Sequence, residues 1–301
     1  MLSIPSATPP DQEPDDASVA PPAIRLGYLP WELVHFSLPY RTPAETSWVR
    51  HNGDRWITFT AGPIQRADGT TEHVLPSGKY ARAALLFLCT QAKLHNSPVV
   101  SIKTTYRSYL KDLGISWNTG SAREAARQLQ ALAACTITIS TQADDHRLVT
   151  DRRFAFSSSS RIAFDHDNQG ALDEKQESEI VLNDDLFASV LEHGNPINRV
   201  AWQLLAASSK SPLALDIYCW LSVRLFTMTK PVQRIRWVDL FEQFGSEGNI
   251  YKFKQNFRRA LDQVLAVYPE ANVTVVGEGE RSGFRGLLLQ TSPNALDSRI
   301  G

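Results

Sequence analysis

The sequence predicts an α+β protein of two tandem winged helix-turn-helix domains, related by internal duplication and preceded by a disordered N-terminal tail. The main observation is that the order helix, strand, helix, helix, β-hairpin occurs twice along the 301 residues. The apolar positions of the first helix in the two copies are related by a constant offset of 133 residues. They are Ala81, Ala84, Leu85, Leu88 and Ala92 in the first copy, and Ala214, Ile217, Tyr218, Leu221 and Leu225 in the second. Two unrelated α+β stretches are the alternative to a duplication.

We expect three units along the chain. Residues 1–24 contain six prolines and four acidic side chains but no Lys or Arg, which predicts a disordered acidic tail. Residues 25–195 are expected to form the first winged-helix domain, with an N-terminal hairpin and an acidic connector. Residues 196–301 are expected to form the second winged-helix domain, which would be the main DNA-recognition module.

The elements of the first half follow from turn signals and apolar periodicity. Asn52-Gly53 separates two runs of β-branched and aromatic residues, which predicts a hairpin with a type I′ turn over residues 46–60. Helices are expected over 77–95, 104–113 and 118–134, with Thr104 or Thr105 capping the second, and a strand over 99–102. Alternation over 135–141 predicts a strand, with 153–157 as its partner and 161–164 as a third strand.

The second half repeats this order. Ser211-Pro212 opens a helix, because Pro suits a first helical turn. The expected elements that follow are a strand near 232–235, helices over 238–244 and 249–267, and a hairpin formed by 272–276 and 284–290.

Three helices followed by a hairpin are typical of a winged helix, whose third helix normally enters the major groove of DNA. The helix over 249–267 places Phe253 and Phe257 on one face and basic residues on the other. The candidate DNA-binding residues of this helix are Lys252, Lys254, Gln255, Arg258 and Arg259. A solvated amphipathic face is the alternative, although such a face needs no particular sign of charge.

Further candidates for DNA contact lie outside this helix. Arg123 and Arg127 lie four residues apart on the third helix of the first half, where a protein interface is an equal alternative. Arg234 and Arg236 alternate on a strand and therefore share one face. Arg281 and Arg285 lie near the tip of the second hairpin.

The formal net charge of -1 hides an uneven distribution. Residues 165–195 contain nine acidic side chains and one lysine, whereas residues 200–260 contain nine basic and four acidic side chains. An acidic connector before a basic unit fits a polyanionic partner. Local variation of a solvated surface is the alternative.

Several classes of function are not expected. The sequence has no P-loop, no HExxH or CxxC pair and no Gly-x-Ser-x-Gly elbow, so we expect no catalytic site, no metal and no cofactor. It has no run of 18 apolar residues and no secretory leader, so no membrane contact is expected. Cys89, Cys135 and Cys219 are far apart in sequence, which fits a reducing cytoplasm.

Four segments resemble the RepA family of plasmid replication initiators. They are SPLALDIYCWLSVRL (Ser211 to Leu225), IVLNDDLFASVLEH (Ile180 to His193), VRHNGDRWITFTA (Val49 to Ala61) and LPSGKYARAALLFL (Leu75 to Leu88). The last departs from the family by having Ser-Gly-Lys-Tyr-Ala where a Tyr-Gly and a Pro are common. The resemblance spans about residues 25–290.

The resemblance implies a bacterial, cytoplasmic initiator that binds directly repeated sites (iterons) at a double-stranded plasmid origin. It also implies recruitment of the host helicase and initiator proteins, and a homodimer through the first winged-helix domain. The alternatives are a winged-helix repressor that controls its own promoter or the plasmid copy number, an interaction scaffold, and a metal-dependent nickase. The absence of an HxH motif argues against the nickase.

Overall fold

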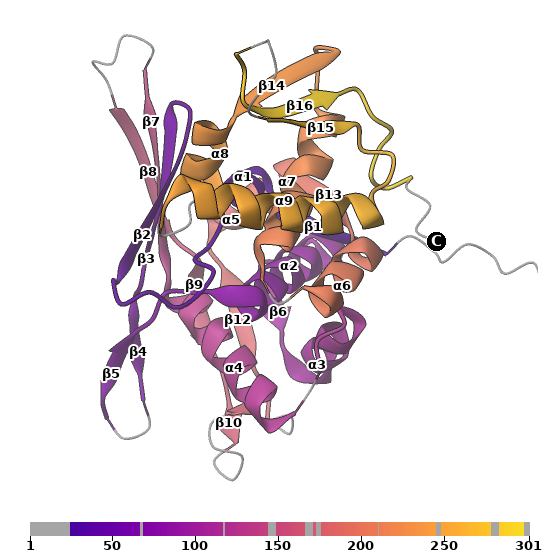
Figure 1. Cartoon of the computed structure of the whole chain (residues 1–301). Helices are drawn as coiled ribbons and strands as arrows, with labels where there is room; N and C mark the ends of the chain where they lie inside the picture. The colour runs from indigo at the N-terminus through magenta and orange to yellow at the C-terminus, as the bar shows by residue number, and fades with distance from the viewer. Residues whose placement is uncertain are drawn as a thin grey trace, which may run out of the picture.

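The computed structural model describes residues 25–66, 69–116, 118–143, 149–165, 171–172, 176–209, 211–244, 248–277 and 283–297. The predicted tail, residues 1–24, therefore lies outside the described residues. The chain mixes helices and sheets, as the predicted α+β class requires, and Figure 1 shows helices packed beside one large sheet.

The large sheet joins the N-terminal hairpin to a second hairpin. Its strands are β2 (Ser47–Asn52), β3 (Arg55–Thr60), β7 (Thr136–Gln142) and β8 (Val149–Ala155), in the order β2-β3-β7-β8. The hairpin predicted at Asn52-Gly53 is confirmed, but the type I′ turn is wrong. Asn52 pairs with Arg55 and ends the strand, so Gly53 and Asp54 form the loop, and only Gly53 has a positive φ (65°). One positive φ at the first loop residue is typical of a type II′ turn.

The first half contains the predicted series of three helices. These are α2 (Gly78–His95), α3 (Lys103–Asp112) and α4 (Thr119–Ala134), with β6 (Val99–Ser101) between the first two. Asn118 caps α4, because its side chain accepts the N–H of Ser121 at 2.9 Å. The cap predicted at Thr104 or Thr105 is wrong, since α3 begins at Lys103 with Ile102 as the N-cap residue.

The second half has the same series. Its elements are α7 (Leu213–Phe226), β14 (Val232–Arg236), α8 (Trp237–Phe244), α9 (Ile250–Val267), β15 (Val273–Val276) and β16 (Gly286–Gln290). The strands form an antiparallel sheet in the order β14-β16-β15. We refer to β15 and β16 as the C-terminal hairpin.

The first half repeats this sheet with different strands from those predicted. β6 pairs with β12 (Glu179–Leu182), which pairs with β9 (Ser157–Arg161), so the order β6-β12-β9 matches β14-β16-β15. The strands predicted over 135–141 and 153–157 do pair with each other, as β7 and β8. β7 also pairs with β3 and so joins the large sheet, a pairing that the sequence did not predict.

The remaining elements lie before and between these two series. They are β1 (Leu26–Pro30), α1 (Trp31–His35), β4 (Pro63–Gln65), β5 (Thr71–His73), β10 (Phe164–Asp165), β11 (Ala171–Leu172), α5 (Asp184–His193), β13 (Gly194–Asn198) and α6 (Arg199–Ser208). The expected boundary between residues 195 and 196 falls inside β13, which pairs with β1. One buried apolar cluster contains Phe59 and Leu88 of the first half and Trp220 of the second. The two halves thus share a core, and their division into separate domains stays a prediction.

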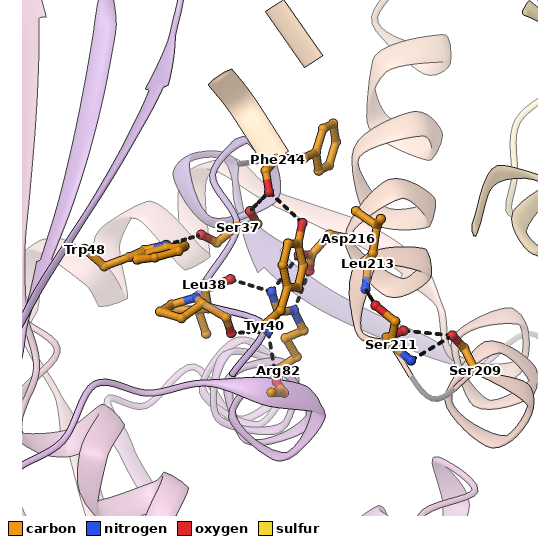
Figure 2. A network of polar contacts seen from close by, with 12 residues as sticks. Ser37, Leu38, Tyr40, Trp48, Arg82, Ser209, Ser211, Leu213, Asp216 and Phe244 are labelled. Atoms are coloured by element: carbon orange, nitrogen blue, oxygen red, sulfur yellow. Dashed lines mark hydrogen bonds and ion pairs between the residues drawn. The ribbon is translucent and has the colours of Figure 1, made fainter. Parts of the chain in front are cut away.

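A buried ion pair also connects the halves (Figure 2). Arg82 of α2 donates to both carboxylate oxygens of Asp216 of α7, each at 2.6 Å. The same guanidinium donates to the carbonyls of Leu38 (2.7 Å), Pro39 (3.2 Å) and Gly78 (2.9 Å). Its hydrogen bonds therefore fix three parts of the chain: α2, α7 and the segment that follows α1.

Candidate nucleic-acid interface

Helix α9 has one buried face and one basic face. Asn249 begins the helix by accepting the N–H of Lys252 at 2.9 Å. Phe253 and Phe257 are fully buried, and Phe257 contacts Trp237 edge to face with ring centroids 5.7 Å apart. This packing fixes the rotation of the helix and leaves the opposite arc in solvent.

The exposed arc carries the predicted cations. Lys252, Gln255, Arg258 and Arg259 are exposed, and Lys254 is partly exposed. No ion pair within the described residues involves the two lysines or the two arginines of this arc. Lys254 lies over the Tyr251 ring at 5.6 Å from its centroid, and Arg258 lies over the Trp237 ring at 5.4 Å. These contacts orient the cations without neutralising them.

An open groove of about 980 Å³ separates the basic arc from the C-terminal hairpin. Its lining contains all five candidate residues of α9 together with Trp237, Tyr251, Asp262, Val276, Gly277 and Arg285. Figure 1 shows the sheet β14-β16-β15 along one side of α9. The sequence did not predict Trp237 as part of this groove. Its ring supports Arg258 only through the packing of α8 against α9, and no sequence pattern indicates that contact.

The arginines of the C-terminal sheet differ in their surroundings. Arg234 and Arg236 are both exposed, with Ile235 buried between them, so their predicted common face is confirmed. Arg236 donates to both oxygens of Asp239, at 2.9 and 2.6 Å, and that guanidinium lowers the pKa of the Asp239 carboxyl. Arg285 lines the groove, whereas Arg281 lies outside the described residues.

The equivalent helix of the first half, α4, has one of its two candidate arginines paired with acidic neighbours. Arg123 is exposed, but Arg127 pairs with Glu72 of β5 at 3.3 Å and with Glu124 at 3.9 Å. Glu72 also pairs with Arg66, and both guanidinium groups lower the pKa of the Glu72 carboxyl. The β4–β5 hairpin reaches α4 through an apolar contact that includes Ile64, Val74 and Ala131. α4 therefore presents less free positive charge than α9.

Two other kinds of site are not seen in the described ranges. They contain no cluster of three or more His, Cys, Asp or Glu side chains that could hold a metal ion. None of the described helices combines the length and the apolar character that crossing a bilayer requires.

Comparisons with known proteins bear on the family and on the fold. Residues 75–239 match the family model described as plasmid-encoded RepA protein. A crystal structure of selenomethionine derivatives of domains 2 and 3 of RctB is 10% identical with a TM-score of 0.54, over 87% of this chain and 96% of that chain. A second structure of RctB domains 2–3 is 8% identical with a TM-score of 0.51, over 86% and 95%. At these identities the likeness to RctB shows a common fold. A comparison with curated protein sequences found no match.

Proposed function

This chain belongs to the plasmid-encoded RepA protein family, and on that premise we propose that it is a bacterial plasmid replication initiator that binds duplex DNA at the plasmid origin. We propose further that each half is a winged helix and that the bound sites are direct repeats. In this proposal the protein has no catalytic site. It would act through binding free energy, as several bound copies strain the origin open and host helicase and initiator proteins are recruited.

The observation that carries the proposal is the unpaired positive charge of α9. Four cations lie on one arc of this helix and form no ion pair with the described carboxylates. A helix whose exposed face was only solvated would need no single sign of charge, whereas a helix in the major groove has phosphates on both sides. The nearby C-terminal hairpin is then positioned to face one DNA backbone.

The side chains of the arc suit different parts of the duplex. Arg258 and Arg259 have planar forks that can pair with phosphates or with guanine edges, and Gln255 can pair with adenine. Lys252 and Lys254 are flexible point charges that suit phosphates. Asp262 is the only acidic residue of α9, and it lines the same groove.

A triple change, Lys254→Ala with Arg258→Ala and Arg259→Ala, tests the assignment. The probe is a labelled 40-bp duplex from the non-coding DNA beside the gene, with a shuffled duplex of the same composition as competitor. We expect the specific affinity to be lost and the slope of log Kobs against log salt to fall by up to about three units, because each phosphate contact contributes about 0.9. An unchanged slope would refute the placement of α9 in the groove.

A matched control comes from the same helix. Asp262→Asn removes the opposing charge at an exposed position, so we expect tighter binding of the shuffled duplex. A substitution that merely disturbed the helix would weaken binding instead.

Initiation is then separated from simple repression by asking whether the gene and its flanking DNA maintain a plasmid that lacks another origin. The triple variant should fail in this assay.

A further inference from the structure

A second groove, of about 680 Å³, runs along the side of α9 that is away from the C-terminal hairpin. The residues that line it come from the segment after α1, from β2, from the α6–α7 connection with the adjoining helix ends, and from α9. They include Tyr40, Arg41, Thr42, Trp48, Lys252 and Arg259. Lys252 and Arg259 line both grooves, so they lie on the crest of α9 between the two.

The charge of this groove has one sign. Its lining contains three cations, Arg41, Lys252 and Arg259, and no carboxylate. Arg41 is exposed and takes part in no ion pair with the described residues. The other polar lining groups include the Tyr40 hydroxyl and the Trp48 indole, which already donate to carbonyls of the protein, and the side-chain amides of Asn256 and Gln263, which can donate hydrogen bonds. Since a phosphodiester carries negative charge and only accepts hydrogen bonds, its chemistry matches this lining.

The position of Arg41 is fixed by its neighbours. The Tyr40 hydroxyl donates to the carbonyl of Phe244, the last residue of α8, at 2.8 Å (Figure 2). The carbonyls of Leu38 and Pro39 accept from Arg82, and the Thr42 hydroxyl contacts that of Ser77 at 2.8 Å. Arg41 therefore belongs to the first half of the chain but is held against the second half.

We propose that this groove seats the phosphodiester backbone of the second DNA strand, with Arg41 as a phosphate contact. The proposal rests on the proposed binding of α9 in the major groove. That groove of B-DNA is about 12 Å wide, so a helix in it has one backbone on each side. The C-terminal hairpin faces one strand, and residues 41–43 face the other. The first half of the chain thus contributes to the DNA site of the second half.

The test compares Arg41→Ala with the wild-type protein on the shuffled 40-bp duplex, by fluorescence anisotropy over a range of salt. We expect the salt slope to fall by about 0.9, which is the loss of one phosphate contact. Raising the salt from 50 to 200 mM weakens the binding of each protein by some factor. For the variant this factor should be about 3.5 times smaller than for the wild-type protein. Arg41→Lys should restore the slope, because a phosphate contact needs the charge and not the fork.

Lys111→Ala is the matched control, since Lys111 is an exposed cation on α3 outside both grooves. It should leave the slope unchanged. If Arg41→Ala also leaves the slope unchanged while the α9 triple variant lowers it, the second groove is not a backbone seat and the proposed function stands. If neither variant lowers the slope, the placement of α9 itself fails. A loss by Arg41→Ala that is larger on a 40-nucleotide single strand than on the duplex would also overturn the proposal.

Discussion

Replacing Asp216 by Asn should destabilise the protein strongly, because the guanidinium of Arg82 would remain in the interior without its carboxylate. Breaking a buried ion pair by removing one partner costs about 3–5 kcal/mol. The structure favours the lower end of this range. The Arg82 side chain is 6% exposed and that of Asp216 14%, so both ions are desolvated. However, Arg82 would keep its hydrogen bonds to three carbonyls, those of Leu38, Pro39 and Gly78. We therefore expect a loss of about 3 kcal/mol.

The measurement is urea unfolding followed by tryptophan fluorescence, since the chain has seven tryptophans and Trp220 is buried in the shared core. The midpoint should fall while the m-value stays constant. Asp239→Asn is the control, because Asp239 forms a pair of the same bidentate kind with Arg236 at the surface. There the solvent already screens both charges, so only a small part of the loss is expected. A loss below about 1 kcal/mol for Asp216→Asn would refute the reasoning that this pair carries an uncompensated desolvation cost.

Two further predictions concern stability. Burial, together with the cations of Arg224 and Arg55, lowers the pKa of His35 from 6.5 to about 4. Between these two pH values His35 is therefore neutral in the folded protein but protonated in the unfolded chain. The free energy of unfolding is therefore unaffected by this titration above pH 6.5 and falls by up to about 3 kcal/mol as the pH falls towards 4. His35→Phe should therefore lose less stability than the wild-type protein between pH 7 and 4.5 in urea unfolding, and equal losses would contradict this. Gly286→Ala should weaken the sheet of the second half, because an added Cβ would lie 1.9 Å from the carbonyl oxygen of Ile235. Gly277→Ala, where nothing lies within 4 Å, should keep the wild-type melting temperature, and a similar fall in both variants would refute the clash.

The elements that the sequence predicted well depend on nearby residues. Asn118 and Asn249 each cap their own helix, and Gly114 ends α3 with a φ of 70° that suits glycine. The apolar stripe of α9 likewise follows from its own period, so the exposed basic arc was predictable from this helix alone.

Two errors are local, namely the turn type at Asn52-Gly53 and the cap of α3, whereas the contacts that the sequence did not predict join partners distant in sequence. The alternation of β7 shows that it is a strand but says nothing of its second neighbour, which is β3. The true partner of β6 is β12, about 80 residues later. In the same way, the ion pair of Arg127 with Glu72 joins residues 55 positions apart. Arg41 gave no signal, because its segment has no periodic pattern and its role depends on packing against α8.

The two halves of the chain show why its net charge is a poor guide to its partner. α4 and α9 occupy the same place in the order of elements, and both expose arginines. The β4–β5 hairpin, which comes before α2, brings Glu72 to Arg127. The residues before α7 form α6 instead and bring no carboxylate to the cations of α9.

A carboxylate beside the exposed cations of a helix leaves its buried packing face unchanged but weakens its attraction for phosphate. Under the proposed function, the neighbours of each third helix therefore decide which copy binds DNA. The position of Arg41 extends this argument. The segment that follows α1 belongs to the first half of the chain, yet it supplies a cation to the groove beside α9. A substitution in the first half can consequently change DNA affinity without any DNA contact by α4. The salt slope of Arg41→Ala measures the contribution of the groove beside α9, and the salt slope of Arg123→Ala measures any contribution of α4.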